Sequence, residues 1–174
     1  TEPHYEADKS GFYLKENLEA YNKRKKRDTK AVKPWEHADL PDSIYADAKI
    51  ANETIKTMKR AVENNKPFFI AAGFLKPHLP FVCPKKYYDL YESSDIELSV
   101  HPKLSKTQSP VSIMPKSGAR KWWDFQKGID DENSRQLIHS YMACVSFIDA
   151  QVGRVLKELE DLGIKNNTAV FFLS

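Results

Sequence analysis

One apolar stretch, Pro67 to Phe81, constrains the fold of this chain more than any other part of the sequence. Its apolar run from Phe68 to Leu75 is too short for a membrane span but has the length of a strand buried on both faces. The run leads directly into the turn sequence Lys76-Pro77-His78-Leu79-Pro80. Enzymes of the α/β class present polar side chains in this way, at the carboxyl end of a strand. The stretch therefore predicts a buried strand that delivers Lys76 and His78 to the edge of a pocket.

Two amphipathic helices are predicted on either side of this strand. Asp42 or Ser43 is placed to cap the first, in which apolar residues recur at three- and four-residue steps as far as Val62. The second begins after Asp130 and ends before Gly163. Short helices are also predicted around Lys15 to Lys26 and from Pro84 to Tyr91, and a buried strand over Thr168 to Ser174. Helix, strand, loop, helix, strand is the order of an α/β fold with helices flanking a sheet.

The chain divides into an irregular surface segment, 1–41, and a layered portion, 42–174. Within the layered portion, prolines and glycines interrupt any helical or strand periodicity between 92 and 128. This predicts a long irregular excursion that shapes a substrate pocket. A core strand with no turn after it indicates that the chain is cut at Ser174. We therefore expect a piece of a larger protein.

Composition excludes several classes of protein. A hydrophobic fraction of 41% and a charged fraction of 29% are typical of a soluble globular chain. The net charge of +3 comes largely from one basic run, Lys23 to Arg27, so a nucleic-acid partner is not predicted. No membrane-spanning run is present. Cys83 and Cys144 are too few for a disulfide framework and lack metal-type spacing, so they leave the redox compartment open.

His78 and Lys76 are the candidate binding residues. A histidine held between two prolines can bind an anionic group through a neutral or charged imidazole N–H, and Lys76 lies beside it. The alternatives are a structural histidine and a solvated lysine. The remaining histidines have no partner at zinc-ligand spacing, and the carboxylates form no recognisable acid/base pair. No complete catalytic set and no metal site are therefore predicted within the chain.

Two ordered blocks of this sequence resemble sulfatases of the iduronate-2-sulfatase type, which belong to the alkaline-phosphatase-like superfamily. The first comprises Pro67 to Phe81 with Pro84-Lys85 and Tyr87 to Tyr91, and the second runs from Ser140 to Leu156. Thr168 to Ser174 is similar to the strand that leads into an Asp-His-Gly metal motif in this family. The resemblance implies that 42–174 is the central portion of a sulfatase catalytic domain. The fold is then a partial sulfatase-like α/β sheet with flanking helices, truncated at both ends.

The same resemblance implies a sulfuric-ester hydrolase acting on a sulfated sugar. Such enzymes use a formylglycine made within a Cys/Ser-x-Pro-x-Arg motif, together with a calcium ion, and His78 matches their sulfate-contacting histidine. Lys76 belongs to the matching motif. Cys83-Pro84-Lys85-Lys86 does not fit the formylglycine motif, and neither the paired aspartates nor the Asp-His-Gly is present. Calcium and formylglycine are therefore expected only in the full-length parent, and the fragment is expected to be inert alone.

Two other functions remain open. The chain could bind sulfated glycans without catalysis, through Lys23 to Arg27 and Lys76, or its parent could be a phosphodiesterase or phosphonate hydrolase of the same superfamily. The expected partners are a sulfate ester and the missing remainder of the same polypeptide, with no nucleic acid and no membrane. By resemblance the protein is exported, to a periplasm, a lysosome or the medium. The exact substrate, the ester type, the oligomeric state and the compartment stay open.

Overall fold

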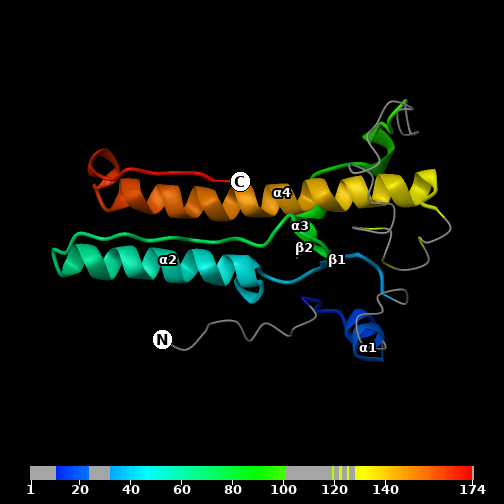
Figure 1. The fold of residues 1–174 in the computed structure, drawn as a ribbon, viewed down its shortest axis with the longest axis horizontal. Coiled ribbons are helices and arrows are strands. Elements are labelled where there is room, and N and C mark those ends of the chain that lie inside the picture. Colours follow the sequence, from blue (N-terminus) through cyan, green and yellow to red (C-terminus); the bar gives the residue numbers. More distant parts are fainter. Residues whose placement is uncertain are drawn as a thin grey trace, which may run out of the picture.

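The computed structural model describes residues 11–23, 32–100, 119, 122, 125 and 128–173. In this part of the chain the two longest helices are α2 (Ala46–Glu63) and α4 (Asp131–Asp161). They lie side by side and run in the same general direction (Figure 1), and an ion pair of 3.3 Å between Lys59 and Glu158 joins them. Both helices were predicted from their apolar periodicity, and both are confirmed.

The beginning of α2 differs from the prediction. A short 3-10 helix, η1 (Asp42–Ile44), precedes it, and the N-cap is Tyr45, whose side chain makes no capping hydrogen bond. The prediction that Asp42 or Ser43 caps this helix is therefore wrong. The Asp42 carboxylate instead contacts side chains of α4 and of the short helix α3 (Lys85–Tyr88), so it is not available to the first turn of α2.

The ends of α4 follow local rules. The Asp130 side chain accepts a hydrogen bond of 2.7 Å from the backbone N–H of Asn133, and Asp131 and Glu132 occupy the first turn. At the other end Gly163 adopts a φ of +68°, a conformation that favours glycine and ends the helix as predicted. Between these two ends α4 is one uninterrupted helix.

The described sheet consists of two short parallel strands, β1 (Trp35–Ala38) and β2 (Phe81–Pro84). Trp35 pairs with Phe81 and Ala38 with Pro84, so β2 begins where the apolar stretch ends. Neither strand was predicted. The helix α3 (Lys85–Tyr88) follows β2 at once, which confirms the short helix predicted from Pro84 to Tyr91 but shortens it, because Pro84 is the N-cap and the helix ends at Tyr88.

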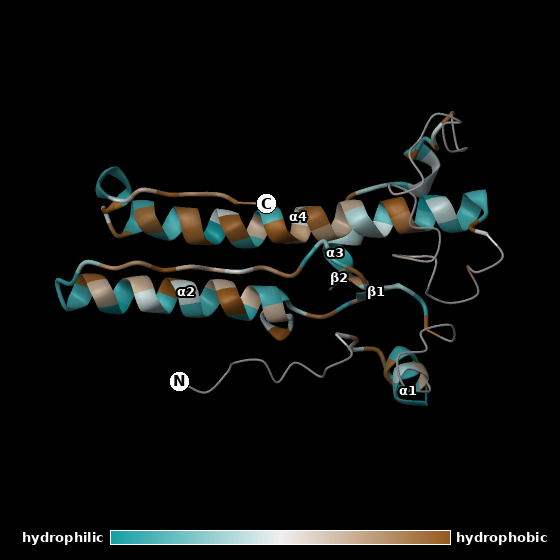
Figure 2. Ribbon diagram, viewed as in Figure 1, coloured by the Kyte–Doolittle hydropathy of each residue, from teal (hydrophilic) through white to brown (hydrophobic). Residues whose placement is uncertain are grey.

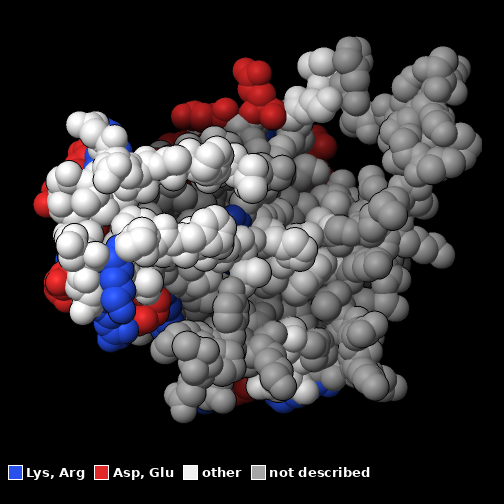
Figure 3. Space-filling view, turned by 60° about the vertical axis from the view of Figure 1, so that its left-hand side comes forward, with Lys and Arg blue, Asp and Glu red and all other residues white. Residues whose placement is uncertain are grey.

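The two predicted buried strands are corrected by the structure. Residues 68–75 and 168–173 belong to no sheet, and the side chains of Phe69 and Phe171 are 94% and 83% exposed. A strand needs a neighbour to take its backbone hydrogen bonds, and in the described residues neither segment pairs with another strand. Figure 2 shows both as extended segments with largely apolar colouring, one running along α2 and the other along α4. In Figure 3 the described part of this face is largely uncharged, and most of its charged side chains lie around the white area.

The buried core lies where β2, α2 and α4 meet. It also receives Phe12, which packs against Tyr21, and Val32, so residues within 1–41 contribute to the same core as the layered portion. The predicted first helix is present as α1 (Lys15–Lys23). Of the predicted excursion over 92–128, the structure describes the short 3-10 helix η2 (Ser93–Asp95) and the residues up to 100, whereas 101–118 lie outside the described residues. The core cluster comprises Phe12, Val32, Tyr45, Ala48, Val82, Cys83, Tyr87, Ala143, Cys144 and Phe147.

Candidate functional site

The turn that contains the candidate residues is anchored by a buried carboxylate. Asp47, in the first turn of α2, is 2% exposed. Its Oδ1 accepts a hydrogen bond of 2.6 Å from the backbone N–H of Leu75, and its Oδ2 accepts one of 3.3 Å from that of Lys76. Because an unpartnered buried carboxylate is costly, these two N–H groups and the carboxylate satisfy one another. The backbone entering the turn is therefore fixed to α2.

Sequence reasoning missed Asp47. The only local signal is a carboxylate directly beside Ala48, on the face of the helix that becomes buried. Burial raises the pKa of Asp47, and the two backbone hydrogen bonds and the Lys76 charge oppose that rise only in part. The carboxylate thus depends on the turn for its ionised state, just as the turn depends on the carboxylate for its position.

The Lys76 side chain folds back onto its own turn. Its Nζ donates to the carbonyl oxygens of Pro80 at 2.6 Å and His78 at 3.1 Å. Burial lowers the pKa of Lys76, and the nearby Cys144, Asp47 and Cys83 counteract this. An ammonium group has three N–H donors, and two of them form these hydrogen bonds to the turn carbonyls. The positive charge is therefore held beneath the turn, and the direct role of Lys76 in binding substrate stays a prediction.

The His78 side chain, in contrast, is exposed at the tip of the turn. Its Nδ1 lies 2.6 Å from the carbonyl oxygen of Leu79, and its backbone N–H donates to Leu75 at 2.9 Å. A carbonyl only accepts, so Nδ1 carries the proton and Nε2 is the ring nitrogen left to meet a ligand. In the neutral ring Nε2 accepts, and it donates only in the imidazolium form. An anion bound at Nε2 therefore requires the charged ring. Of the neutral and the charged imidazole considered from the sequence, only the charged one can donate a hydrogen bond from Nε2.

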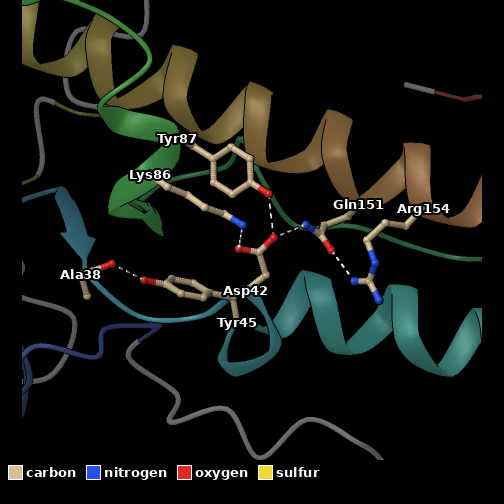
Figure 4. Close-up of polar contacts among 7 residues, drawn as sticks. All are labelled: Ala38, Asp42, Tyr45, Lys86, Tyr87, Gln151 and Arg154. Atoms are coloured by element: carbon tan, nitrogen blue, oxygen red, sulfur yellow. Dashed lines mark hydrogen bonds and ion pairs between the residues drawn. The ribbon is translucent and has the colours of Figure 1, made fainter.

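A second polar cluster lies away from this turn and holds the elements together (Figure 4). Asp42 accepts from the Tyr87 hydroxyl at 2.6 Å and from Gln151 Nε2 at 3.1 Å, and Lys86 Nζ lies 2.7 Å from its other oxygen. Arg154 extends the cluster by donating to Gln151 at 2.8 Å, and it also donates to Asn52 of α2. Burial acts to raise the pKa of Asp42, but the hydrogen bonds from Lys86, Tyr87 and Gln151 outweigh it and lower the pKa. The cluster joins η1, α3, α4 and α2.

Two histidines sandwich a tyrosine beside the sheet. The Tyr88 ring stacks on His37 at a centroid distance of 3.8 Å and on His139 at 3.7 Å. His139 Nε2 lies 2.9 Å from the Tyr88 carbonyl oxygen, whereas the buried His37 Nε2 and His139 Nδ1 atoms have no protein partner in the described part of the chain. Burial and the neighbouring His139 lower the pKa of His37 to about 3. The His37 ring is therefore neutral at physiological pH and is not a ready proton donor.

The catalytic groups implied by the family resemblance do not fit the residues described here. Within 11–23, 32–100 and 128–173, and at 119, 122 and 125, no group of three or more His, Cys, Asp or Glu side chains could hold a metal ion. Cys83 is fully buried and is followed by Pro84, which does not match a formylglycine motif. No helix in the described ranges has the length and apolar character needed to cross a membrane.

The fold and the turn together define an α/β protein that presents one exposed histidine beside a partly buried lysine. The profile of the Sulfatase family matches residues 5–174, so the chain belongs to the sulfatase family. The α/β class and the resemblance predicted from the Lys76-Pro77-His78 and Ser140–Leu156 blocks are thereby confirmed. Members of this family are sulfatase-type hydrolases.

Individual relatives agree with this assignment. The chain is 34% identical to iduronate 2-sulfatase of Mus musculus and 32% identical to that of Homo sapiens, in each case over 81% of this chain and 27% of the relative. It is also 27% identical to a sulfatase of Formosa agariphila over 80% of this chain and 27% of that protein. The chain thus spans about a quarter of the length of the curated relatives it matches.

Proposed function

We propose that this chain forms the sulfate-binding wall of a sulfatase active site, with His78 contacting the sulfate group of the ester. The observation that carries the proposal is the Lys76–Pro80 turn. Its backbone is fixed by the buried Asp47 carboxylate while the His78 imidazole remains exposed. Membership of the sulfatase family supports a sulfate ester as the ligand.

The chemistry of the turn suits an oxyanion. In its imidazolium form, His78 donates from Nε2 to a sulfate oxygen, while Nδ1 keeps the ring oriented through the Leu79 carbonyl. The Lys76 ammonium, closed into the turn by two carbonyls, adds positive potential below the anion without competing for its place. Groups fixed in this way stabilise charge that develops on sulfate oxygens without having to reorganise during the reaction.

The remaining chemistry belongs to residues beyond this chain. Formylglycine would supply the nucleophile and calcium would supply positive charge for the sulfate oxygens, but no group of His, Cys, Asp or Glu side chains in the described residues could hold the metal ion. We infer that the 174-residue chain is inert alone and that the substrate of the longer enzyme is a sulfated sugar, as the names of its mammalian relatives suggest. We also infer an exported enzyme, on the basis of the family resemblance alone.

The first test uses the chain as it is. The purified protein is incubated with 4-nitrophenyl sulfate beside a His78→Ala variant, and release of 4-nitrophenol is followed. Both proteins are expected to match buffer, because the chain contains no complete catalytic set. Hydrolysis by the unmodified chain above the His78→Ala rate would overturn the inference that it is inert.

The second test places the same substitution in an enzyme of the relatives' full length. There, His78→Ala is expected to lower kcat/KM for an aryl sulfate by roughly 100- to 1,000-fold, the cost of removing one charge-stabilising donor. A His101→Ala variant, at a histidine outside the matched motif, serves as the control. Equal kcat/KM values for the two variants would exclude a sulfate contact at His78.

Assays in the same enzyme separate the rival esters. Aryl phosphate and phosphonate esters are compared with the aryl sulfate at equal concentration, and a higher kcat/KM for either phosphorus ester would reassign the reaction. The glycan-binding alternative depends mainly on the basic run Lys23 to Arg27, of which residues 24–27 lie outside the described residues. The described part of the chain offers no observation in its favour.

A further inference from the structure

The cysteines of this chain meet in its core, although they come from distant parts of the sequence. Cys83 lies on β2 and Cys144 in the middle of α4, and the sequence contains no other cysteine. Both are free thiols that are completely buried, and both belong to the single cluster of core residues around Val82 and Phe147. Helix α4 packs against β2, and within this cluster the two thiols are close enough to interact directly. The packing of α4 on β2 therefore brings the two cysteines together in the core.

A positive charge accompanies the two thiols. The Lys76 ammonium interacts electrostatically with both sulfurs, more strongly with Cys144 than with Cys83. Its Nζ also closes the Lys76–Pro80 turn, so the same ammonium group interacts with the turn and with the thiol pair. A nearby cation favours the thiolate form, which is the nucleophile in disulfide exchange. The contact with Cys144 and the burial of Cys83 raise the pKa of Cys83, and the Lys76 charge opposes that rise.

We propose that Cys83 and Cys144 form a disulfide bond that ties β2 to α4 beneath the Lys76–Pro80 turn. The oxidant is a low-molecular-weight disulfide such as oxidised glutathione. The thiolate of one cysteine attacks one sulfur of this disulfide and releases one thiol, giving a mixed disulfide. The thiolate of the other cysteine then attacks the protein sulfur of the mixed disulfide and releases the second thiol. Overall, two protein thiols are oxidised to one disulfide and the small disulfide is reduced to two thiols.

The position of the pair determines when this reaction occurs. Fully buried sulfurs do not meet a soluble oxidant in the closed structure, so the bond forms during folding, before α4 covers β2. The closed bond links segments far apart in the chain, and such a link restricts the unfolded ensemble. It also holds β2, which follows the turn directly, against α4. This proposal concerns the chain itself and does not depend on sulfate binding at His78.

The test is to refold the unmodified chain with reduced and oxidised glutathione, and in parallel with dithiothreitol. Each sample is denatured, alkylated with iodoacetamide and analysed by intact and peptide mass spectrometry. With glutathione we expect the loss of two hydrogen masses, no alkylation, and a cross-linked peptide pair containing Cys83 and Cys144. The oxidised chain is also expected to melt roughly 5 to 15 °C above the reduced chain.

The opposite results are equally clear. Two alkylated cysteines, two glutathione adducts or disulfide-linked dimers from the glutathione sample would each overturn the proposal. A Cys144→Ser variant serves as the control, and its melting temperature is expected to be the same after either treatment. If that variant does not fold, the comparison of the oxidised and reduced wild-type chains decides the matter alone.

Discussion

The carboxylate of Asp47 accepts a hydrogen bond of 2.6 Å from the backbone N–H of Leu75, 28 residues further along the chain. This contact fixes the end of the extended segment 67–75 to the first turn of α2. Because the next residue, Lys76, donates to the same carboxylate, the turn that carries His78 begins from a defined position. The entrance of the turn is thus positioned by α2, whereas its exit continues directly into β2, which pairs with β1.

Asp47→Asn is expected to destabilise the chain by about 1 to 3 kcal/mol, because the amide group places a donor against a backbone donor in a buried position. Urea unfolding followed by circular dichroism measures the loss. Asp149→Asn, at an exposed position on α4, is the matched control and is expected to change stability by less than about 0.5 kcal/mol. Identical midpoints for both variants would show that the Asp47 contacts do not stabilise the turn.

Acid is expected to weaken the fold through His37. Its pKa is about 3 in the folded chain against a usual 6.5, so the unfolded chain takes up the proton first as the pH falls. The stabilisation is complete above pH 6.5 and decreases towards pH 3, by at most about 1.4 kcal/mol per pH unit. Nearby Asp89 works against the shift, whereas His139 and Lys85 add to it.

The pH effect is measured as the difference between the wild type and His37→Gln in urea midpoints from pH 7 to pH 4. The variant is expected to lose less stability over this interval, because it no longer has this titrating ring. Phe69→Ser, at an exposed position without a titrating group, should retain the wild-type slope. Parallel slopes for wild type and His37→Gln would contradict a buried neutral His37.

Tyr87→Phe removes the hydroxyl that donates to Asp42 at 2.6 Å but keeps the ring that packs against Phe147. We expect a loss of about 1.5 to 3 kcal/mol, the usual contribution of a hydrogen bond to a charged group. The loss should diminish at acid pH, because the wild-type Asp42 carboxyl, whose pKa is lowered, then becomes protonated in the folded chain as well. Thermal unfolding at neutral and acid pH tests both statements, with Tyr141→Phe as the exposed control. Equal losses of stability in Tyr87→Phe and Tyr141→Phe would show that the hydrogen bond from Tyr87 to Asp42 contributes little to the stability of the fold.

The exposed apolar segments should make the isolated chain prone to association. Phe69 and Phe171 are 94% and 83% exposed, and unpaired extended segments with such side chains recruit further chains. The double variant Phe69→Ser/Phe171→Ser is expected to bind less of a hydrophobic dye and to stay monomeric at higher concentration in light scattering. Its urea midpoint should be unchanged, and a clear fall in that midpoint would show that these rings are packed in solution.

The sequence and the structure agree best where structure is local. Helix α4 was predictable because Asp130 caps it, Gly163 ends it and its apolar residues repeat at helical spacing, all of which depend on neighbours within a few residues. The apolar run before Lys76 was misassigned as a buried strand, because a pattern of apolar residues does not show whether a pairing strand is present. The strands β1 and β2 were not predicted, because each is only four residues long and has no clear alternation of apolar and polar residues.

The sequence by itself determined the family, the two long helices and the residues His78 and Lys76 as candidates, because these depend on short motifs and on local periodicity. Only the tertiary structure decided that Asp47 holds the turn, that the Lys76 ammonium is turned inward, and that Cys83 lies against Cys144. Each of those relationships joins residues from different elements. Their distances are set by how α2, α4 and the small sheet pack together, and no spacing along the chain records that packing.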